Sequence, residues 1–196
     1  ITPEKKFPFS IASAPIKQRQ IELHIKPTPE SKDSEVIESI INSSEVLEIE
    51  APLGDCYIEK PPTRPLILLA ASTGITQMKS IIEFLEPHGF EQETFLYWGV
   101  ISPDDLYLDD LCSNWDDKHS NFHYIPVISE PNKSSNWQGR IGLVGEAALQ
   151  DFNDLSNTNV YVSGSAGMVY ATLDSFIDHG MPEENMFSDV FSFSPR

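Results

Sequence analysis

The sequence predicts an α/β protein: a doubly wound parallel sheet of five strands, preceded by a smaller, partial antiparallel β-barrel. After Thr63, short apolar runs alternate with helix-like segments, which indicates parallel strands joined by right-handed crossovers. Before that point, apolar residues alternate with polar ones at period two, which is typical of antiparallel strands. Prolines 61, 62 and 65 separate the two patterns. The expected domains are therefore a partial barrel at 1–62 and an α/β domain at 63–196.

The first part of the chain predicts strands with one intervening helix. Phe9–Ser13 is a short apolar segment, and Gln20–Ile25 alternates polar and apolar residues. Val36–Ile41 has helix-like apolar spacing. Glu45–Glu50 returns to strand character. These segments form the expected barrel piece.

The second part begins with a continuous apolar run, Pro65–Ala70, as expected of a strand that is buried on both faces. Further strands and helices follow in strict alternation. Strands are expected at 65–70, 95–98, 122–128, 159–163 and 186–193, and helices at 75–86, 103–115, 142–151 and 166–179.

Two turns of small residues, 71–74 and 163–168, follow the first and the fourth of these strands. If the strand order is 3-2-1-4-5, both turns lie at the switch point, where doubly wound sheets bind ligands. Small residues let the backbone approach a ligand closely, and helix N–H groups can face an anion. Neither turn matches a phosphate loop or the G-x-G-x-x-G fingerprint, and Gly164–Gly167 is too short for a nucleophile elbow. A P-loop ATPase, a standard Rossmann dehydrogenase and a serine hydrolase are disfavoured.

Composition excludes other classes. The net charge of -17 disfavours nucleic acid and membrane surfaces as partners. Two cysteines, Cys56 and Cys112, cannot hold an internal iron–sulfur cluster and indicate a reducing compartment. The five histidines show no metal-ligand spacing, so no metal is expected. Without a signal peptide or a membrane-spanning apolar run, the expected location is cytoplasmic.

Several short segments, in this order and spacing, resemble the ferredoxin–NADP reductase superfamily. Within it, the chain is similar to the bacterial NAD(P)H:flavin oxidoreductases, including the luminescence-associated flavin reductases. The segments that carry the resemblance are 8–13, 21–25, 72–74, 97–99, 137–140, 163–164 with Met168, and 187–193.

The resemblance implies hydride transfer from NADH or NADPH to FAD, FMN or riboflavin, with little acid–base chemistry required of the protein. It implies Ser10 as the catalytic residue, hydrogen-bonded near flavin N5. Thr73 and Gly74 would lie against the pyrophosphate and nicotinamide, and Ser163 and Gly164 would close the other side. The implied cofactor-binding positions are Pro8, Phe9, Ser10, Ile11, His24, Ser72, Thr73, Gly74, Gly99, Ser163, Gly164, Met168, Phe191 and Phe193. Phe191 and Phe193 fit a core strand equally well.

The chain departs from the family pattern in three places. Phe7 stands where family members carry an arginine that can bind the flavin phosphate, which favours a flavin that diffuses in as a substrate. Ser72 replaces the first glycine of a Gly-Thr-Gly turn, a mild change by sequence. The family barrel also starts several strands before Ile1, so the flavin site is expected to be partly built in this chain.

The loop after the second strand, 99–105, holds Asp104 and Asp105 and no cation. Because a 2′-phosphate needs a cation there, NADH is the expected donor. The expected acceptor is a flavin passed to a partner such as a flavin-dependent monooxygenase or a luciferase-type enzyme. Two alternatives stay open: an electron-transfer component of an oxygenase or ferredoxin system, and a non-catalytic relative that has lost flavin turnover.

Overall fold

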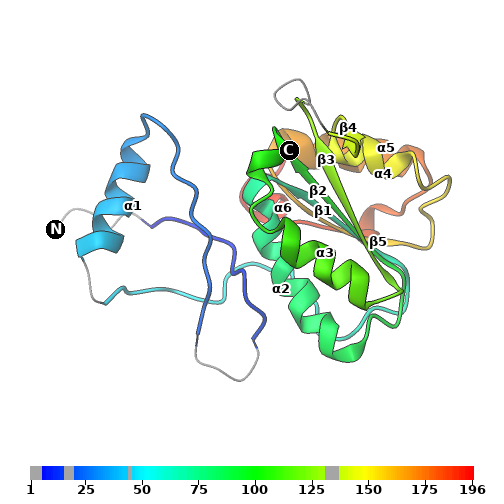
Figure 1. Ribbon diagram of the computed structural model, residues 1–196, viewed down its shortest axis with the longest axis horizontal. Coiled ribbons are helices and arrows are strands. Elements are labelled where there is room, and N and C mark those ends of the chain that lie inside the picture. Colours follow the sequence, from blue (N-terminus) through cyan, green and yellow to red (C-terminus); the bar gives the residue numbers. More distant parts are fainter. Residues whose placement is uncertain (1–5, 16–19, 44–45, 131–136) are drawn as a thin grey trace.

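The protein is described by a computed structural model over residues 6–15, 20–43, 46–130 and 137–196. An α/β body occupies the second half of the chain, and helix α1 (Lys32–Ser43) stands away from it on the N-terminal segment (Figure 1). Glu45, part of one expected strand, lies outside the described residues.

One parallel sheet with the order β4-β3-β2-β1-β5-β6 forms the centre of this body. The expected order 3-2-1-4-5 is thus confirmed, and a two-residue strand is added at one edge. The order reverses between β1 and β5, which defines the switch point. The strands are β1 Leu66–Ala71, β2 Thr94–Val100, β3 Phe122–Ile128, β4 Arg140–Ile141, β5 Asn159–Ser163 and β6 Met186–Phe187.

Helices cover both faces of the sheet (Figure 1). Leu66 and Leu68 pack with α2 and α3 on one face, whereas Ile67 and Leu69 pack with α4 and α5 on the other. This alternation explains why β1 is apolar at every position: each face of a central parallel strand is buried. The helices are α2 Ile75–Leu85, α3 Asp109–Lys118, α4 Val144–Leu149, α5 Ala166–Asp178 and α6 Val190–Phe193.

Two element predictions in this half were wrong in detail. The tail forms a strand only at β6 and then turns into α6, because the Ser188 hydroxyl accepts the Val190 N–H at 3.3 Å and the Ser188 carbonyl accepts the Phe191 N–H at 3.2 Å. The helix expected at 103–115 is divided into a 3₁₀ turn, Pro103–Asp105, and α3. Ser102 and Asp105 form a capping box there that closes the short turn.

The strands expected at 9–13, 20–25 and 45–50 do not form in the described residues of the N-terminal half. The first two segments run side by side, and the Ala12 N–H donates to the Glu22 carbonyl at 2.8 Å, but no ladder extends from this bond in the described part. A strand needs a partner for its backbone groups. The alternation of polar and apolar residues is present in the sequence whether or not a partner strand is. Without a partner strand, Ile21, Val46 and Ile49 are exposed. The helix expected at 36–41 is confirmed within α1.

Candidate nicotinamide and flavin site

The two turns of small residues meet at the switch point. β1 and β5 are hydrogen-bonded neighbours, with Ala70 opposite Ser163. The approach is so close that a Cβ on Gly74 would lie 2.3 Å from the Ser163 carbonyl oxygen. The Gly74 φ of -58° suits any residue, so the demand for glycine is steric. The predicted convergence of the two turns is therefore confirmed, and their backbones lie closer together than the sequence indicates.

The turn between β1 and α2 is held by two side-chain hydrogen bonds. The buried Trp98 indole donates from Nε1 to the Ser72 carbonyl at 2.9 Å. The Thr76 hydroxyl donates to the Thr73 carbonyl at 2.8 Å. Gly74 is the N-cap residue of α2 and offers no side-chain cap. A 3₁₀ turn, Ser72–Gly74, leads directly into the helix, and its Ser72 and Thr73 carbonyls accept the Ile75 N–H.

Ser72 departs from the family pattern at a conformationally demanding position. Its φ is +51°, in the left-handed region that glycine tolerates best. The substitution of glycine by serine is therefore not the mild change that the sequence suggests.

We expect Ser72→Gly to raise the free energy of unfolding by about 1 kcal/mol, because it removes the clash of a Cβ at positive φ. Urea unfolding would measure the change as a shift of the midpoint at constant slope. Ser72→Ala keeps the Cβ and is the matched control, with a midpoint close to that of the native chain. Equal midpoints for all three proteins would contradict this explanation.

The second turn follows β5. A Cβ on Gly164 would lie 3.2 Å from the Ala71 Cβ and 2.4 Å from the Met168 sulfur, so glycine keeps this turn against β1. Ser165 caps α5 by accepting the Met168 N–H at 3.3 Å. Ser163 and Gly164 are half-buried on the same rim. Thr73 and Gly74, which follow β1, therefore lie against Ser163 and Gly164, which end and follow β5. These four residues are called the cradle below.

Gly99 has a packing role in the structure. It pairs with Ala71 at the end of β2, and a Cβ there would lie 3.2 Å from the Val144 Cβ of α4. Of the two loop carboxylates, Asp105 is engaged: it accepts the Ser102 hydroxyl at 3.0 Å and the Lys26 ammonium at 3.2 Å. Asp104 is exposed and is the acidic side chain that this loop presents to solvent.

Pro8, Phe9, Ser10 and Ile11 lie on an extended segment with Pro8 and Phe9 exposed and the other two half-buried. Phe7, Pro8 and Phe9 line a hollow that is closed on its other sides by residues 25–28 and α1. After Ile11 the chain passes onto α2, where Ala12 and Ala14 are buried.

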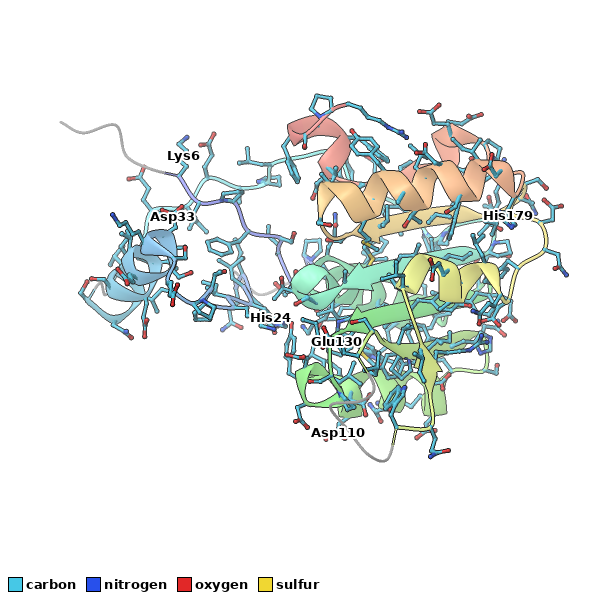
Figure 2. All side chains as sticks on the ribbon, turned by 90° about the horizontal axis from the view of Figure 1, so that it is seen from above. Lys6, His24, Asp33, Asp110, Glu130 and His179 are labelled. Atoms are coloured by element: carbon cyan, nitrogen blue, oxygen red, sulfur yellow. The ribbon has the colours of Figure 1, made fainter. Side chains whose placement is uncertain are left out.

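His24 lies where the N-terminal segment meets the α/β body (Figure 2). Both ring nitrogens are hydrogen-bonded, Nδ1 to the Tyr107 hydroxyl at 2.8 Å and Nε2 to the Glu22 carboxylate at 2.6 Å. The Tyr107 ring in turn packs edge-on against Trp98, at 5.4 Å between centroids. In this structure His24 is an internal link between the N-terminal segment and the body of the protein, and its cofactor contact stays a prediction.

The two tail aromatics differ. Phe191 packs on the core, 5.7 Å from the Tyr170 ring, whereas the Phe193 side chain is 72% exposed in α6. Phe191 thus fits the core alternative, and Phe193 is the aromatic available to cover a ligand.

Asp189, directly before α6, was not predicted from the sequence as a site residue. It is half-buried, and its carboxylate contacts α2. Its carboxylate accepts the Gln77 amide of α2 at 3.2 Å, and the same amide reaches the Cys56 carbonyl at 3.1 Å. Burial raises the pKa of Asp189, and burial also raises the pKa of the Cys56 thiol to about 12. Cys56 is therefore a poor nucleophile at neutral pH. The position of this aspartate within the aromatic segment 187–193 is the sequence feature that could have indicated its burial.

Two negative findings concern the described residues alone. None of their helices has the length and apolarity to cross a membrane. Their histidine, cysteine and carboxylate side chains form no cluster of three that could hold a metal ion.

Comparisons with known proteins identify the family of this chain. Residues 68–174 match the model of the oxidoreductase NAD-binding domain. The chain therefore belongs to this family of NAD-binding oxidoreductases.

Its relatives include bacterial flavin reductases, as the resemblance predicted. The probable flavin reductase of Aliivibrio fischeri is 35% identical over 96% of this chain and 81% of its own length. A CDP-6-deoxy-L-threo-D-glycero-4-hexulose-3-dehydrase reductase of Yersinia pestis is 36% identical over 93% of this chain. This chain spans 54% of that relative, about half its length. A solved cytochrome P450 reductase of Amycolatopsis shares the fold, with a TM-score of 0.77, 21% identity, and coverage of 92% of this chain and 55% of its own.

Proposed function

We propose that this chain carries the nicotinamide site, and part of the flavin site, of an NAD(P)H:flavin oxidoreductase. One observation carries the proposal. Two glycine-containing turns meet at the switch point beside the start of α2, and a Cβ at Gly74 or Gly164 would collide with the atoms packed against it. Such a cradle fits a flat ring and a pyrophosphate better than it fits acid–base catalysis.

The reaction requires the protein mainly to hold the nicotinamide and the flavin in the correct relative position. A bound flavin supplies the acceptor for the hydride that leaves nicotinamide C4. The backbone at Thr73 and Gly74 would lie against the pyrophosphate and nicotinamide, and Ser163 and Gly164 would close the other side of the nicotinamide. Ser10 would orient the flavin through its hydroxyl, and Phe193 would cover the paired rings. Exclusion of water and correct alignment account for the rate.

We propose NADH as the preferred donor. Asp104 is exposed on the loop after β2, and Lys26, a nearby cation, is hydrogen-bonded to Asp105 at 3.2 Å. A carboxylate suits the ribose hydroxyls of NADH and repels the 2′-phosphate of NADPH. The flavin would be a diffusing substrate, because Phe7 supplies no cation for its phosphate.

The test is anaerobic oxidation of NADH, followed at its own absorbance band, with and without added riboflavin, FMN and FAD. The proposal expects oxidation that depends on the flavin, fastest with riboflavin and slower with NADPH than with NADH. A folded chain that binds NADH and reduces no flavin would overturn it in favour of a non-catalytic relative.

A second candidate is the reductase component of a larger enzyme system, supported by the likeness to the dehydrase reductase. Flavin that co-purifies in a one-to-one ratio, with transfer of electrons to a partner protein, would favour it. Under the first proposal the acceptor of reduced flavin is instead a flavin-dependent monooxygenase or luciferase-type enzyme.

A further inference from the structure

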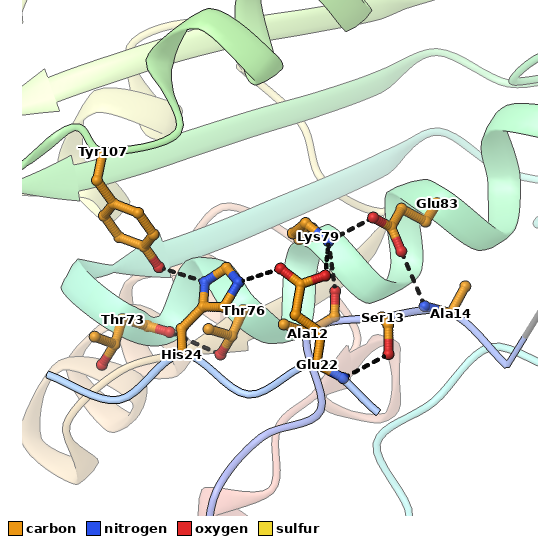
Figure 3. Close-up of polar contacts among 10 residues, drawn as sticks. All are labelled: Ala12, Ser13, Ala14, Glu22, His24, Thr73, Thr76, Lys79, Glu83 and Tyr107. Carbon is orange, nitrogen blue, oxygen red and sulfur yellow. Dashed lines mark hydrogen bonds and ion pairs between the residues drawn. The ribbon is translucent and has the colours of Figure 1, made fainter. Parts of the chain in front are cut away.

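Helix α2 contacts both halves of the proposed site. Its first residue, Ile75, directly follows Gly74 of the nicotinamide turn. One turn later, three side chains of the same helix bind the N-terminal segment just after Ser10. Figure 3 shows two of them, Lys79 and Glu83. These three, Lys79, Ser80 and Glu83, are called the α2 clamp below.

The α2 clamp binds main-chain groups of three consecutive residues. The Lys79 ammonium donates to the Ala12 carbonyl at 3.2 Å. The Ser80 hydroxyl donates to the Ser13 carbonyl at 2.9 Å. The Ala14 N–H donates to the Glu83 carboxylate at 3.1 Å. A segment without a strand partner needs such side chains to satisfy its backbone where it is buried.

Lys79 is an unusual residue for this position, because its side chain is only 6% exposed. It is paired with the Glu22 carboxylate at 2.8 Å and with Glu83 one helical turn along. Burial would lower the pKa of Lys79, but the hydrogen bonds to Glu22 and Glu83 outweigh this and raise it. Burial of an ammonium group costs free energy unless the group is fully paired, so the three partners of Lys79 fix the geometry of the contacts that it makes.

A second connection leads from the same carboxylate to the other side of the site. The second oxygen of Glu22 binds His24, which binds Tyr107 (Figure 3). Tyr107 packs on Trp98, whose indole holds the Ser72 carbonyl in the nicotinamide turn. The segment that carries Ser10 is therefore tied to both sides of the turn that contains Thr73 and Gly74.

We propose that Lys79, Ser80 and Glu83 are positioning residues that set the separation between the flavin held at Ser10 and the nicotinamide held at Thr73 and Gly74. This inference rests on the proposed function. Lys79 contacts the Ala12 carbonyl, and with Ser80 and Glu83 it would act through the backbone of residues 12–14. Since hydride transfer requires the reacting atoms to lie about 3–3.5 Å apart, a small shift of this segment slows the reaction without weakening nicotinamide binding.

The experiment compares Lys79→Gln, Lys79→Arg and Ser80→Ala with the native sequence in the full chain. Single-turnover reduction of riboflavin by NADH gives the hydride-transfer rate constant, and a titration of NADH gives its dissociation constant. Lys79→Gln is expected to lower the rate constant by about 10- to 100-fold and to change the dissociation constant less than about twofold. Lys79→Arg keeps a cation and should recover part of the rate, and Ser80→Ala should give a smaller loss without leaving a buried charge unpaired.

Lys118→Gln, at an exposed position in the last turn of α3, is the matched control and should leave both constants unchanged. Hydrogen exchange provides a readout that does not need turnover: amides of residues 10–14 should exchange faster in Lys79→Gln than in the native chain. Native-like rates and exchange in both Lys79→Gln and Ser80→Ala would overturn the inference while leaving the proposed function intact. Failure of the native chain to reduce flavin would instead overturn the proposed function, and the exchange data would still show whether the α2 clamp orders the segment.

Discussion

Gly74→Ala is expected to lower the free energy of unfolding by about 1–3 kcal/mol and the rate of NADH oxidation by about 100-fold. The added Cβ would lie 2.3 Å from the Ser163 carbonyl oxygen and 2.8 Å from its carbonyl carbon. Both are backbone atoms of a strand that is hydrogen-bonded to β1. The clash therefore cannot be relieved by a side-chain rotation, and the two turns must move apart at the proposed nicotinamide site.

The measurement is a urea unfolding curve together with an NADH titration. Gly167→Ala is the matched control for stability, because it lies in the first turn of α5 on the same rim and a Cβ there meets no atom within 4 Å. A glycine inside a helix costs roughly 0.5–1 kcal/mol relative to alanine, so this variant should be more stable than the native chain. If Gly74→Ala unfolds at the native midpoint and binds NADH normally, the contact between the turns is not what shapes the site.

Predictions from the sequence succeeded where a single local signal was sufficient. The apolar run of β1 identified a strand buried on both faces, and the alternation of strands with helices indicated a parallel, doubly wound sheet. The order 3-2-1-4-5, which was assumed for this sheet and is observed, places residues 71–74 next to 163–168. The steric demand for glycine at position 74 became apparent only in the structure, where a Cβ would lie 2.3 Å from the Ser163 carbonyl oxygen.

The predictions failed where the signal depended on distant partners. Alternation at residues 20–25 records which side chains share a face, and it carries no information about whether a neighbouring strand is present. The left-handed backbone conformation at Ser72 could not be predicted either, because serine has no strong preference for that conformation.

The α2 clamp also depends on residues that are distant in the sequence, and the sequence did not predict it. Lys79 occupies a helix that the sequence shows as amphipathic, where lysine is normally solvated. Its partners Glu22 and Ala12 are 57 and 67 residues away in the chain. A helical pattern alone cannot reveal such pairing, although a lysine between apolar neighbours, Met78 and Ile81, was the available clue.

Ser10→Ala is expected to lower the rate constant of hydride transfer by about 100-fold while leaving the NADH dissociation constant within about twofold. The resemblance implies that the Ser10 hydroxyl binds flavin near N5, where charge develops as the hydride arrives. A hydrogen bond to developing charge strengthens in the transition state, so its loss acts on the rate and little on the binding of the donor.

Single-turnover reduction under anaerobic conditions separates the two quantities. Ser10→Thr retains a hydroxyl and should recover much of the rate, which a purely steric role for the side chain would not produce. An unchanged rate constant in Ser10→Ala would remove Ser10 from the site while leaving the nicotinamide cradle untouched. Ser10 is half-buried and two residues before the buried Ala12, so its hydroxyl and the α2 clamp act on the same segment. A loss in Lys79→Gln, which leaves the Ser10 hydroxyl in place, would show that alignment of this segment affects the rate separately from that hydroxyl, and the recovery in Ser10→Thr distinguishes the two effects.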